Sequence, residues 1–123
     1  MTPLDAAKNN QTPFRNREGS IADDRPCQAN KIPQPINLDA IERDWAGRGY
    51  SYHRFEDPAG QVWRDFVHAT NEVITVAKGQ LKVTIEGEAF VADVGDEVFI
   101  PRGATHSVAN TAAGKTVRLF GYD

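Results

Sequence analysis

The sequence predicts an all-β protein, a small barrel or sandwich of short strands with one helix before them. Eight short runs rich in β-branched and aromatic residues follow residue 50, and turn signals such as Asp57-Pro58-Ala59-Gly60 separate them. The runs recur at intervals of roughly 8–12 residues, which is typical of barrels and sandwiches. With 123 residues, the chain has room for a single domain.

The composition changes at about residue 36. Residues 1–35 hold five of the seven prolines and few large apolar side chains, so they cannot bury enough surface to offset the entropy of ordering. We therefore predict a flexible N-terminal arm over residues 1–35 and a folded β-barrel domain over residues 36–123. The alternative is an arm that lies across the barrel or a partner subunit, anchored by Phe14 or Ile21.

One short amphipathic helix is predicted over residues 38–46. Asn37 is a favourable N-cap, and Gly47 is a natural end. The apolar residues that recur at helical spacing are Leu38, Ile41 and Trp45.

The eight predicted strands follow this helix. They span residues 50–56, 61–68, 72–77, 80–86, 88–92, 97–100, 106–110 and 116–122. The strand over residues 72–77 is largely apolar on both faces, and such a strand needs cover on both. A second subunit or the N-terminal arm would supply that cover, and we predict a homodimer.

Charge and hydropathy exclude two classes of partner. The formal net charge is −3 and no run of Lys and Arg is present, so we expect no nucleic acid. No apolar run approaches the roughly 20 residues that span a bilayer, and the N-terminus lacks the pattern of a secretion signal. Cys27 is the single cysteine. These observations predict a cytoplasmic protein without a membrane partner.

The histidines and one acid carry the chemistry. In a straight strand His68 and Glu72 would lie about 13 Å apart, too far to share an ion, so the chain must turn at residues 69–71, where Asn71 suits a turn. His68 then ends one strand and Glu72 begins its neighbour. His106 arrives from a third strand, so the three side chains can meet only inside a closed or nearly closed barrel.

Two segments resemble the motifs of the cupin superfamily. The pattern G-x5-P-x-G-x2-H-x3-N is matched at every position from Gly95 to Asn110. The pattern G-x5-H-x-H-x3-E-x6-G is matched from Gly60 to Gly79, except that Phe66 replaces the first histidine. The resemblance covers about three-fifths of the chain and is to compact bacterial single-domain cupins. It implies a double-stranded β-helix, the RmlC-like jelly-roll barrel.

The resemblance also implies that His68, Glu72 and His106 occupy metal-ligand positions around one divalent ion. Two histidines and one carboxylate suit non-haem Fe²⁺ with open coordination positions, and Zn²⁺, Mn²⁺ or Ni²⁺ are alternatives. Without an ion, the two histidines would be core residues held by hydrogen bonds, and Glu72 would form a salt bridge with Arg64.

Two further residues are candidates for substrate binding. Phe66 is either a lost ligand that marks a non-catalytic protein, or a pocket wall that keeps an open coordination position dry. Arg64 would hold a substrate carboxylate with two parallel hydrogen bonds, or it lies at the rim of the barrel. His53 is expected on an edge strand, and no catalytic acid or base can be named from the sequence.

The leading functional hypothesis is a metal-dependent enzyme that acts on a small organic molecule, with dioxygenase-like oxidative chemistry favoured. The main alternative is a non-catalytic module that binds or senses a metal or small molecule, which Phe66 and the missing general base favour. A sugar-acid isomerase and a purely structural barrel are the remaining alternatives, because this fold hosts many unrelated activities.

Overall fold

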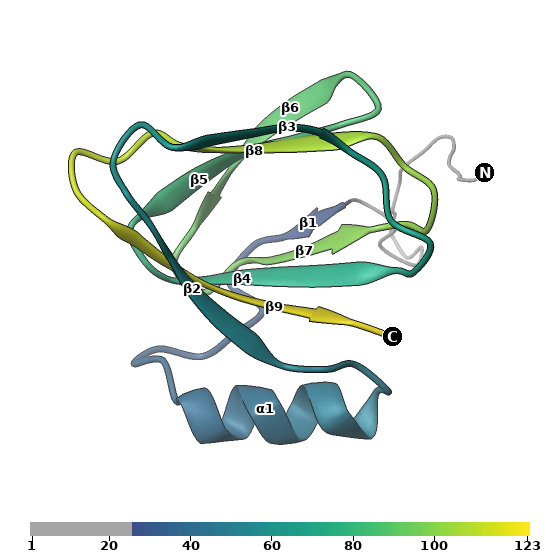
Figure 1. Cartoon of the computed structure of the whole chain (residues 1–123). Coiled ribbons are helices and arrows are strands. Elements are labelled where there is room, and N and C mark those ends of the chain that lie inside the picture. Colours follow the sequence, from purple (N-terminus) through teal and green to yellow (C-terminus); the bar gives the residue numbers. More distant parts are fainter. Residues whose placement is uncertain (1–25) are drawn as a thin grey trace, which may run out of the picture.

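The computed structural model describes residues 26–123 as two facing sheets with one helix outside them (Figure 1). The elements are β1 Cys27–Gln28, α1 Leu38–Gly47, β2 His53–Asp57, β3 Val62–Phe66, β4 Glu72–Lys78, β5 Gln80–Ile85, β6 Glu88–Asp93, β7 Glu97–Ile100, β8 His106–Asn110 and β9 Thr116–Tyr122. All eight predicted strands are present, β1 is additional, and the predicted all-β jelly-roll class is confirmed.

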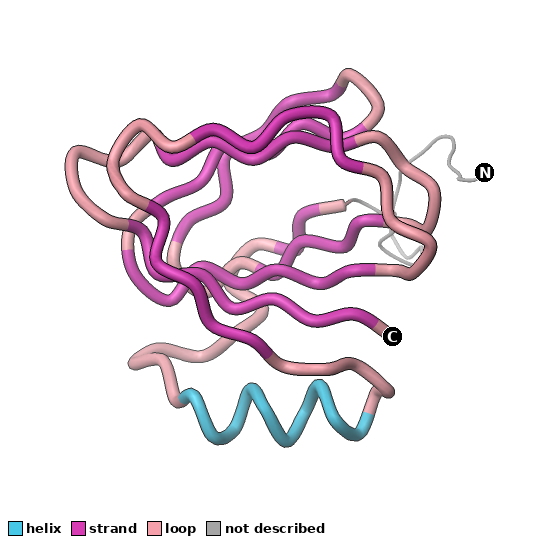
Figure 2. Tube along the Cα trace, in the orientation of Figure 1, coloured by secondary structure: helices cyan, strands magenta, loops and turns pink. Residues whose placement is uncertain are grey.

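The strands are divided between two antiparallel sheets, which appear as two layers in Figure 2. The five-stranded sheet has the order β1-β7-β4-β9-β2, and the four-stranded sheet has the order β3-β8-β5-β6. Neighbours such as β3 and β8, or β4 and β9, are far apart in the chain. Segments distant in the sequence are therefore brought together, as the two motifs require.

The main core lies between the two sheets. Its fully buried side chains include Ile74 and Val76 of β4 and Leu81 and Val83 of β5. The other members are Ile85, Ala92, Val98, Ile100, Ala104 and Val108. Burial of such side chains stabilises the fold by roughly 1.5–3 kcal/mol each, so this cluster fixes the strand register.

Helix α1 packs against the outer face of the five-stranded sheet. Asn37 caps it as predicted, because its Oδ1 accepts a hydrogen bond of 3.0 Å from the Ala40 N–H. Ile41 and Trp45 are buried, whereas Leu38 stays 41% exposed. The helix ends at Gly47, one residue later than predicted.

This helix supplies cover that the sequence analysis assigned to a dimer or to the arm. Val73 on the outer face of β4 forms a second buried cluster with Ile41, Trp45 and Leu119. The two-sided apolar character of β4 is therefore explained within one chain. It gives no independent support for a homodimer.

Part of the predicted arm lies against the sheet edge. Strand β1 pairs with β7, the Phe99 N–H donates to the Pro26 carbonyl at 2.7 Å, and the Ile32 N–H donates to the Gly95 carbonyl at 2.8 Å. The prediction for the rest of the arm, including Phe14, falls outside the described residues. Within residues 26–123, no helix is long and apolar enough to cross a membrane.

Candidate metal centre

Strand β3 carries a bulge just before the site. Trp63 lies opposite Val108 and Phe66 lies opposite His106, so β3 has one more residue than β8 between these pairs. Asp65 takes the extra place with a φ of 56°. Trp63 and Phe66 therefore both line the pocket, although a straight strand would point residues of odd and even number to opposite faces.

The turn between β3 and β4 forms where the sequence predicted it, and hydrogen bonds fix it to two other segments. Asn71 donates its N–H and its Nδ2 to the Asp123 carboxylate at 3.0 and 2.8 Å. Its Oδ1 accepts the Arg102 N–H at 2.8 Å, and the Gly103 N–H donates to the His68 carbonyl at 2.9 Å. The Asn71 side-chain hydrogen bond is the main cause that lowers the pKa of Asp123. The His68 segment and the loop before His106 are thus held together.

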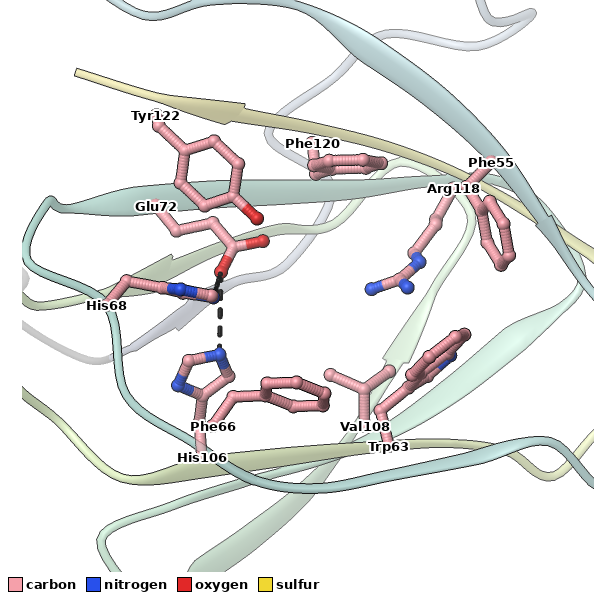
Figure 3. A pocket seen from close by; sticks show the side chains of 10 residues that line it. All are labelled: Phe55, Trp63, Phe66, His68, Glu72, His106, Val108, Arg118, Phe120 and Tyr122. Atoms are coloured by element: carbon pink, nitrogen blue, oxygen red, sulfur yellow. Dashed lines mark ion pairs between the residues drawn. The ribbon is translucent and has the colours of Figure 1, made fainter.

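The structure brings His68, Glu72 and His106 together (Figure 3). Glu72 begins β4 and His106 begins β8, while His68 lies in the turn, two residues after β3 ends. The Glu72 Oε1 atom lies 3.5 Å from Nε2 of each histidine. Glu72 and His106 are buried, with 3% and 4% exposed, and His68 is partly exposed. The sequence prediction that these three side chains converge matches this geometry.

These positions suit a bound cation. Ligand atoms about 2.0–2.2 Å from one ion lie roughly 3.0–3.4 Å apart in octahedral or tetrahedral geometry. Glu72 Oε1 lies 3.5 Å from both imidazole nitrogens, close to this spacing, and all three atoms lie within 4.8 Å of one another. Glu72 Oε1 is also buried without a hydrogen-bond partner, which is costly for a carboxylate unless a cation compensates it. The residues present therefore fit a divalent metal.

His106 is oriented by the backbone. Its Nδ1 lies 3.1 Å from the Ala104 carbonyl oxygen. A carbonyl can only accept, so Nδ1 carries the proton and donates it, and in the neutral ring Nε2 keeps its lone pair toward Glu72. This is the arrangement that a metal-ligating imidazole requires.

Burial and hydrogen bonding act on His106 in opposite directions. Burial is the largest single effect and lowers its pKa, while the Glu72 contact and the Ala104 carbonyl raise it. The raising effects together prevail, and the pKa of His106 lies above its usual value. Without metal, the Glu72 carboxylate thus attracts a proton to this imidazole, in the place where a cation would bind.

The triad lines one end of a pocket of about 170 Å³. An engineered cavity of about 150 Å³ in another protein binds benzene. The pocket here is of similar size and therefore suits a small molecule. Phe66 lines the wall beside both histidines, with ring centroids 6.2 Å from His68 and 6.3 Å from His106, and it is 40% exposed. The interpretation of Phe66 as a pocket wall is consistent with this position.

The arginine in the pocket is Arg118. Arg64, the predicted substrate-binding arginine, is exposed and is not among the side chains that line the pocket. The bulge at Asp65 is the physical reason, because it places Trp63 and Phe66 on the pocket side and removes Arg64 from it. The alternative salt bridge between Arg64 and Glu72 is likewise absent from the described residues.

Arg118 and Tyr122 were missed by the sequence analysis. Both lie in β9 with Phe120, at alternate positions that face the pocket. The sequence did contain a signal for them. Arg118 is the single cationic residue of this largely apolar strand, and it is spaced by two and four residues from the aromatic residues Phe120 and Tyr122. Tyr122 packs edge-on against His68 at 5.1 Å between ring centroids, and burial is the main cause that raises its pKa, so its hydroxyl stays protonated near neutral pH.

A buried ion pair holds Arg118. Its Nε lies 2.9 Å from Asp57 Oδ2, although the alignment falls short of a hydrogen bond. Asp57 is 1% exposed, and its Oδ1 accepts a hydrogen bond of 2.8 Å from Trp63 Nε1. His53, in contrast, lies outside the pocket lining, on edge strand β2 as predicted.

The fold of the chain is similar to the folds of several solved structures. The TT1209 protein from Thermus thermophilus is 24% identical, with a TM-score of 0.55, over 59% of this chain and 71% of that one. A cupin 2 domain-containing protein from Halorhodospira halophila is 21% identical, with a TM-score of 0.54, over 63% and 55%. An oxalate oxidase in complex with the substrate analogue glycolate is 25% identical, with a TM-score of 0.55, over 66% and 46%.

The chain thus spans about half of the second and third of these structures. No curated protein matches the sequence. Residues 53–120 match the family described as Cupin domain, and this segment is more than half of the chain. The chain belongs to the cupin domain family.

Proposed function

We propose that this cupin is a metal-dependent enzyme that acts on a small organic molecule, with Fe²⁺ as the favoured ion and oxidative chemistry as the reaction. The observation that carries this proposal is the Glu72 Oε1 atom, which is buried without a hydrogen bond and lies 3.5 Å from two imidazole nitrogens. Burial of a carboxylate oxygen without a hydrogen bond is costly, and a bound cation would compensate this cost.

Two histidines and one carboxylate leave coordination positions open, and in this set Fe²⁺ supports reactions with O₂. The protein's part is to hold the ligands, shape the pocket and exclude water. The Ala104 carbonyl orients His106, and the clamp at Asn71 holds the His68 segment near the His106 loop. Phe66 occupies the wall where a fourth ligand would otherwise stand.

Oxidative chemistry is further supported by the comparison with an oxidase, which reaches 25% identity. Tyr122 adds a protonated hydroxyl at the same end of the pocket. Its hydroxyl is suited to donate a hydrogen bond to a bound substrate.

The second candidate function is a module that binds a metal and a small molecule without turnover. Phe66 favours it, because an aromatic ring stands at the position of a ligand and is 40% exposed at the pocket. The two candidates share the metal site and differ in whether O₂ is consumed.

The test begins with metal content. Wild-type protein purified without a tag is expected to hold about one divalent ion per chain, measured by elemental analysis. His106→Ala is expected to lose at least nine-tenths of it, while the matched control His53→Ala keeps it, since His53 lies outside the pocket. Equal ion content in all three proteins would refute the site.

Turnover is tested with the Fe²⁺-loaded protein in an oxygen electrode. Substrate-dependent O₂ consumption that disappears in His106→Ala supports the enzyme. No consumption across a broad panel of small organic acids, alcohols and phenols, with iron shown to be bound, supports the binding module instead.

Assembly and location stay predictions. A homodimer is supported by the outer face of the four-stranded sheet, where Val62 and Val91 are 39% and 49% exposed in the same row of paired residues. Light scattering at micromolar concentration should give twice the mass of the chain, and a monomer mass would contradict the prediction. A cytoplasmic location stays a prediction from the sequence, in which Cys27 is the single cysteine.

A further inference from the structure

We propose that the end of the pocket opposite the triad is a carboxylate receptor, and that Arg118 determines specificity for a small monocarboxylate substrate. Figure 3 shows the Arg118 guanidinium on the far side of the pocket from His68, with its terminal nitrogens pointing into the space between. The assignment of a substrate class rests on the proposed function. Binding of an anion by Arg118 can be tested independently of it.

Arg118 is held in place before any ligand arrives. Its Nε lies 2.9 Å from the buried Asp57 carboxylate, and its side chain is only 13% exposed. The guanidinium carbon lies over the rings of Phe55 and Phe120, at 5.4 and 5.3 Å from their centroids. A fixed guanidinium loses little conformational entropy when it binds an anion.

The structural role of Arg118 leaves its best donors unused. The ion pair to Asp57 runs through Nε. Within the described part of the chain, the structure shows no hydrogen bond from either terminal nitrogen. The guanidinium of an arginine is a planar fork that matches a carboxylate with two parallel hydrogen bonds, and here the free side of the fork faces the pocket.

The charges in the pocket favour one negative charge on the ligand. Asp57 offsets Arg118, and Glu72 offsets half of a divalent ion, which leaves one positive charge. Asp57 does not compete for the ligand, because its oxygens are already turned to Arg118 and to the Trp63 N–H at 2.8 Å. A monoanion would make the loaded pocket neutral.

The walls between the two ends favour a flat or apolar body. Five apolar or aromatic side chains line the pocket, namely Phe55, Trp63, Phe66, Val108 and Phe120. The volume of about 170 Å³ admits a ligand of the size of one substituted ring or a short-chain acid. The substrate class is therefore a small monocarboxylate whose body lies between the rings, with the group to be transformed directed toward the triad.

Benzoate and benzamide provide a matched pair of probes, because they share the ring and differ in charge. Their binding to the full chain is measured by calorimetry, once with the metal-loaded protein and once after treatment with a chelator. We expect benzoate to bind at least about tenfold more tightly than benzamide in the metal-loaded protein. The preference should persist but become smaller after chelation, because the charge of Glu72 is then uncompensated and repels an anion. Absence of benzoate binding, or its loss after the metal is removed from folded protein, would overturn the proposal.

Two variants test the role of Arg118. Arg118→Lys keeps the charge and loses the fork, and benzoate is expected to weaken by about 10- to 100-fold while benzamide changes little. Arg118→Gln leaves Asp57 without its counter-charge and endangers folding, so the second variant is the double replacement Asp57→Asn with Arg118→Gln, which removes both charges. It should also lose the preference for benzoate.

Arg64→Gln is the matched control, since Arg64 is exposed and outside the pocket lining. It should bind benzoate like the wild type. Unchanged benzoate affinity in both Arg118 variants would overturn the proposal that Arg118 binds the carboxylate. Metal content measured on the same samples separates this result from the proposed function, because an ion-free chain that still prefers benzoate refutes the metal site and leaves the receptor intact.

Discussion

The two ends of the pocket hold their buried carboxylates in different ways. Asp57 is compensated within the chain, because Trp63 donates to one oxygen at 2.8 Å and Arg118 lies 2.9 Å from the other. Glu72 has only two imidazole nitrogens at 3.5 Å. Neither Glu72 Oε1 nor Asp57 Oδ2 accepts a hydrogen bond, so the difference lies in the permanent guanidinium charge beside Asp57. The charge of Asp57 is balanced by Arg118 of the same chain, whereas the charge of Glu72 has no permanent positive charge beside it.

This difference separates a structural acid from a ligand. Replacement of a buried carboxylate that has its counter-charge costs stability, because the partner charge is left uncompensated. A buried carboxylate without one costs stability until a cation binds. Replacement of each acid by its amide should therefore change the stability of the metal-free protein in opposite directions.

The largest effect is expected for Asp57→Asn. The replacement leaves Arg118 largely buried without its counter-charge, so we expect the free energy of unfolding to fall by about 3 kcal/mol. Urea unfolding of the metal-free protein measures the change. Glu56→Gln on the same strand is the control, because Glu56 makes exposed ion pairs with Arg54 and Lys115, and this variant should lose much less stability. An equal loss of stability in the two variants would contradict the view that Asp57 is the buried counter-charge of Arg118.

Glu72→Gln should act in the opposite sense. It removes a buried charge that lacks a hydrogen bond, and we expect the metal-free protein to gain about 1–2 kcal/mol of stability at pH 8. The same variant should lose its metal in elemental analysis. A destabilised Glu72→Gln would mean that the chain alone already compensates this carboxylate.

Asn71→Ala sharpens the comparison at the triad end. The variant keeps all three ligands but removes the side-chain hydrogen bonds to Asp123 and Arg102. We expect metal affinity to fall by about tenfold, since groups that orient ligands contribute at this level. A competition assay with a chelating dye measures it, and Thr70→Ala in the same turn should bind metal normally. An unchanged affinity would show that the turn holds His68 without this clamp.

The smallest effect concerns pH. The pKa of His106 is raised in the folded protein, so protonation of His106 stabilises the metal-free chain below about pH 6.5, its unfolded value. This contribution is lost as pH rises through the folded pKa. With metal bound the sign reverses, because protons compete with the ion for the imidazole. Urea midpoints at pH 6 and pH 8, with and without metal, should move in opposite directions, and His106→Asn should abolish the difference.

The fold was accessible from the sequence because it depends on local signals, and the triad was accessible because its two segments resemble the cupin motifs. Turn residues and alternating apolar runs mark each strand, and the spacing around His68, Glu72 and His106 requires a turn and a closed barrel. Arg118 and the Asp65 bulge depend on pairing between distant strands, which one sequence does not reveal. A single extra residue reversed the expected direction of Arg64, since strand alternation fails at an unrecognised bulge.

The buried carboxylate of Glu97 has a consequence for local motion. It accepts hydrogen bonds from Trp45 and Arg48 of the helical region and from Lys31 of the N-terminal segment, so two other parts of the chain are joined to β7. Amide protons of this outer layer should exchange with deuterium as one slow cooperative unit. The β3 edge has no such outer layer within the described residues and carries exposed Phe66. It should exchange earlier, which would give small molecules a route into the pocket without unfolding the rest.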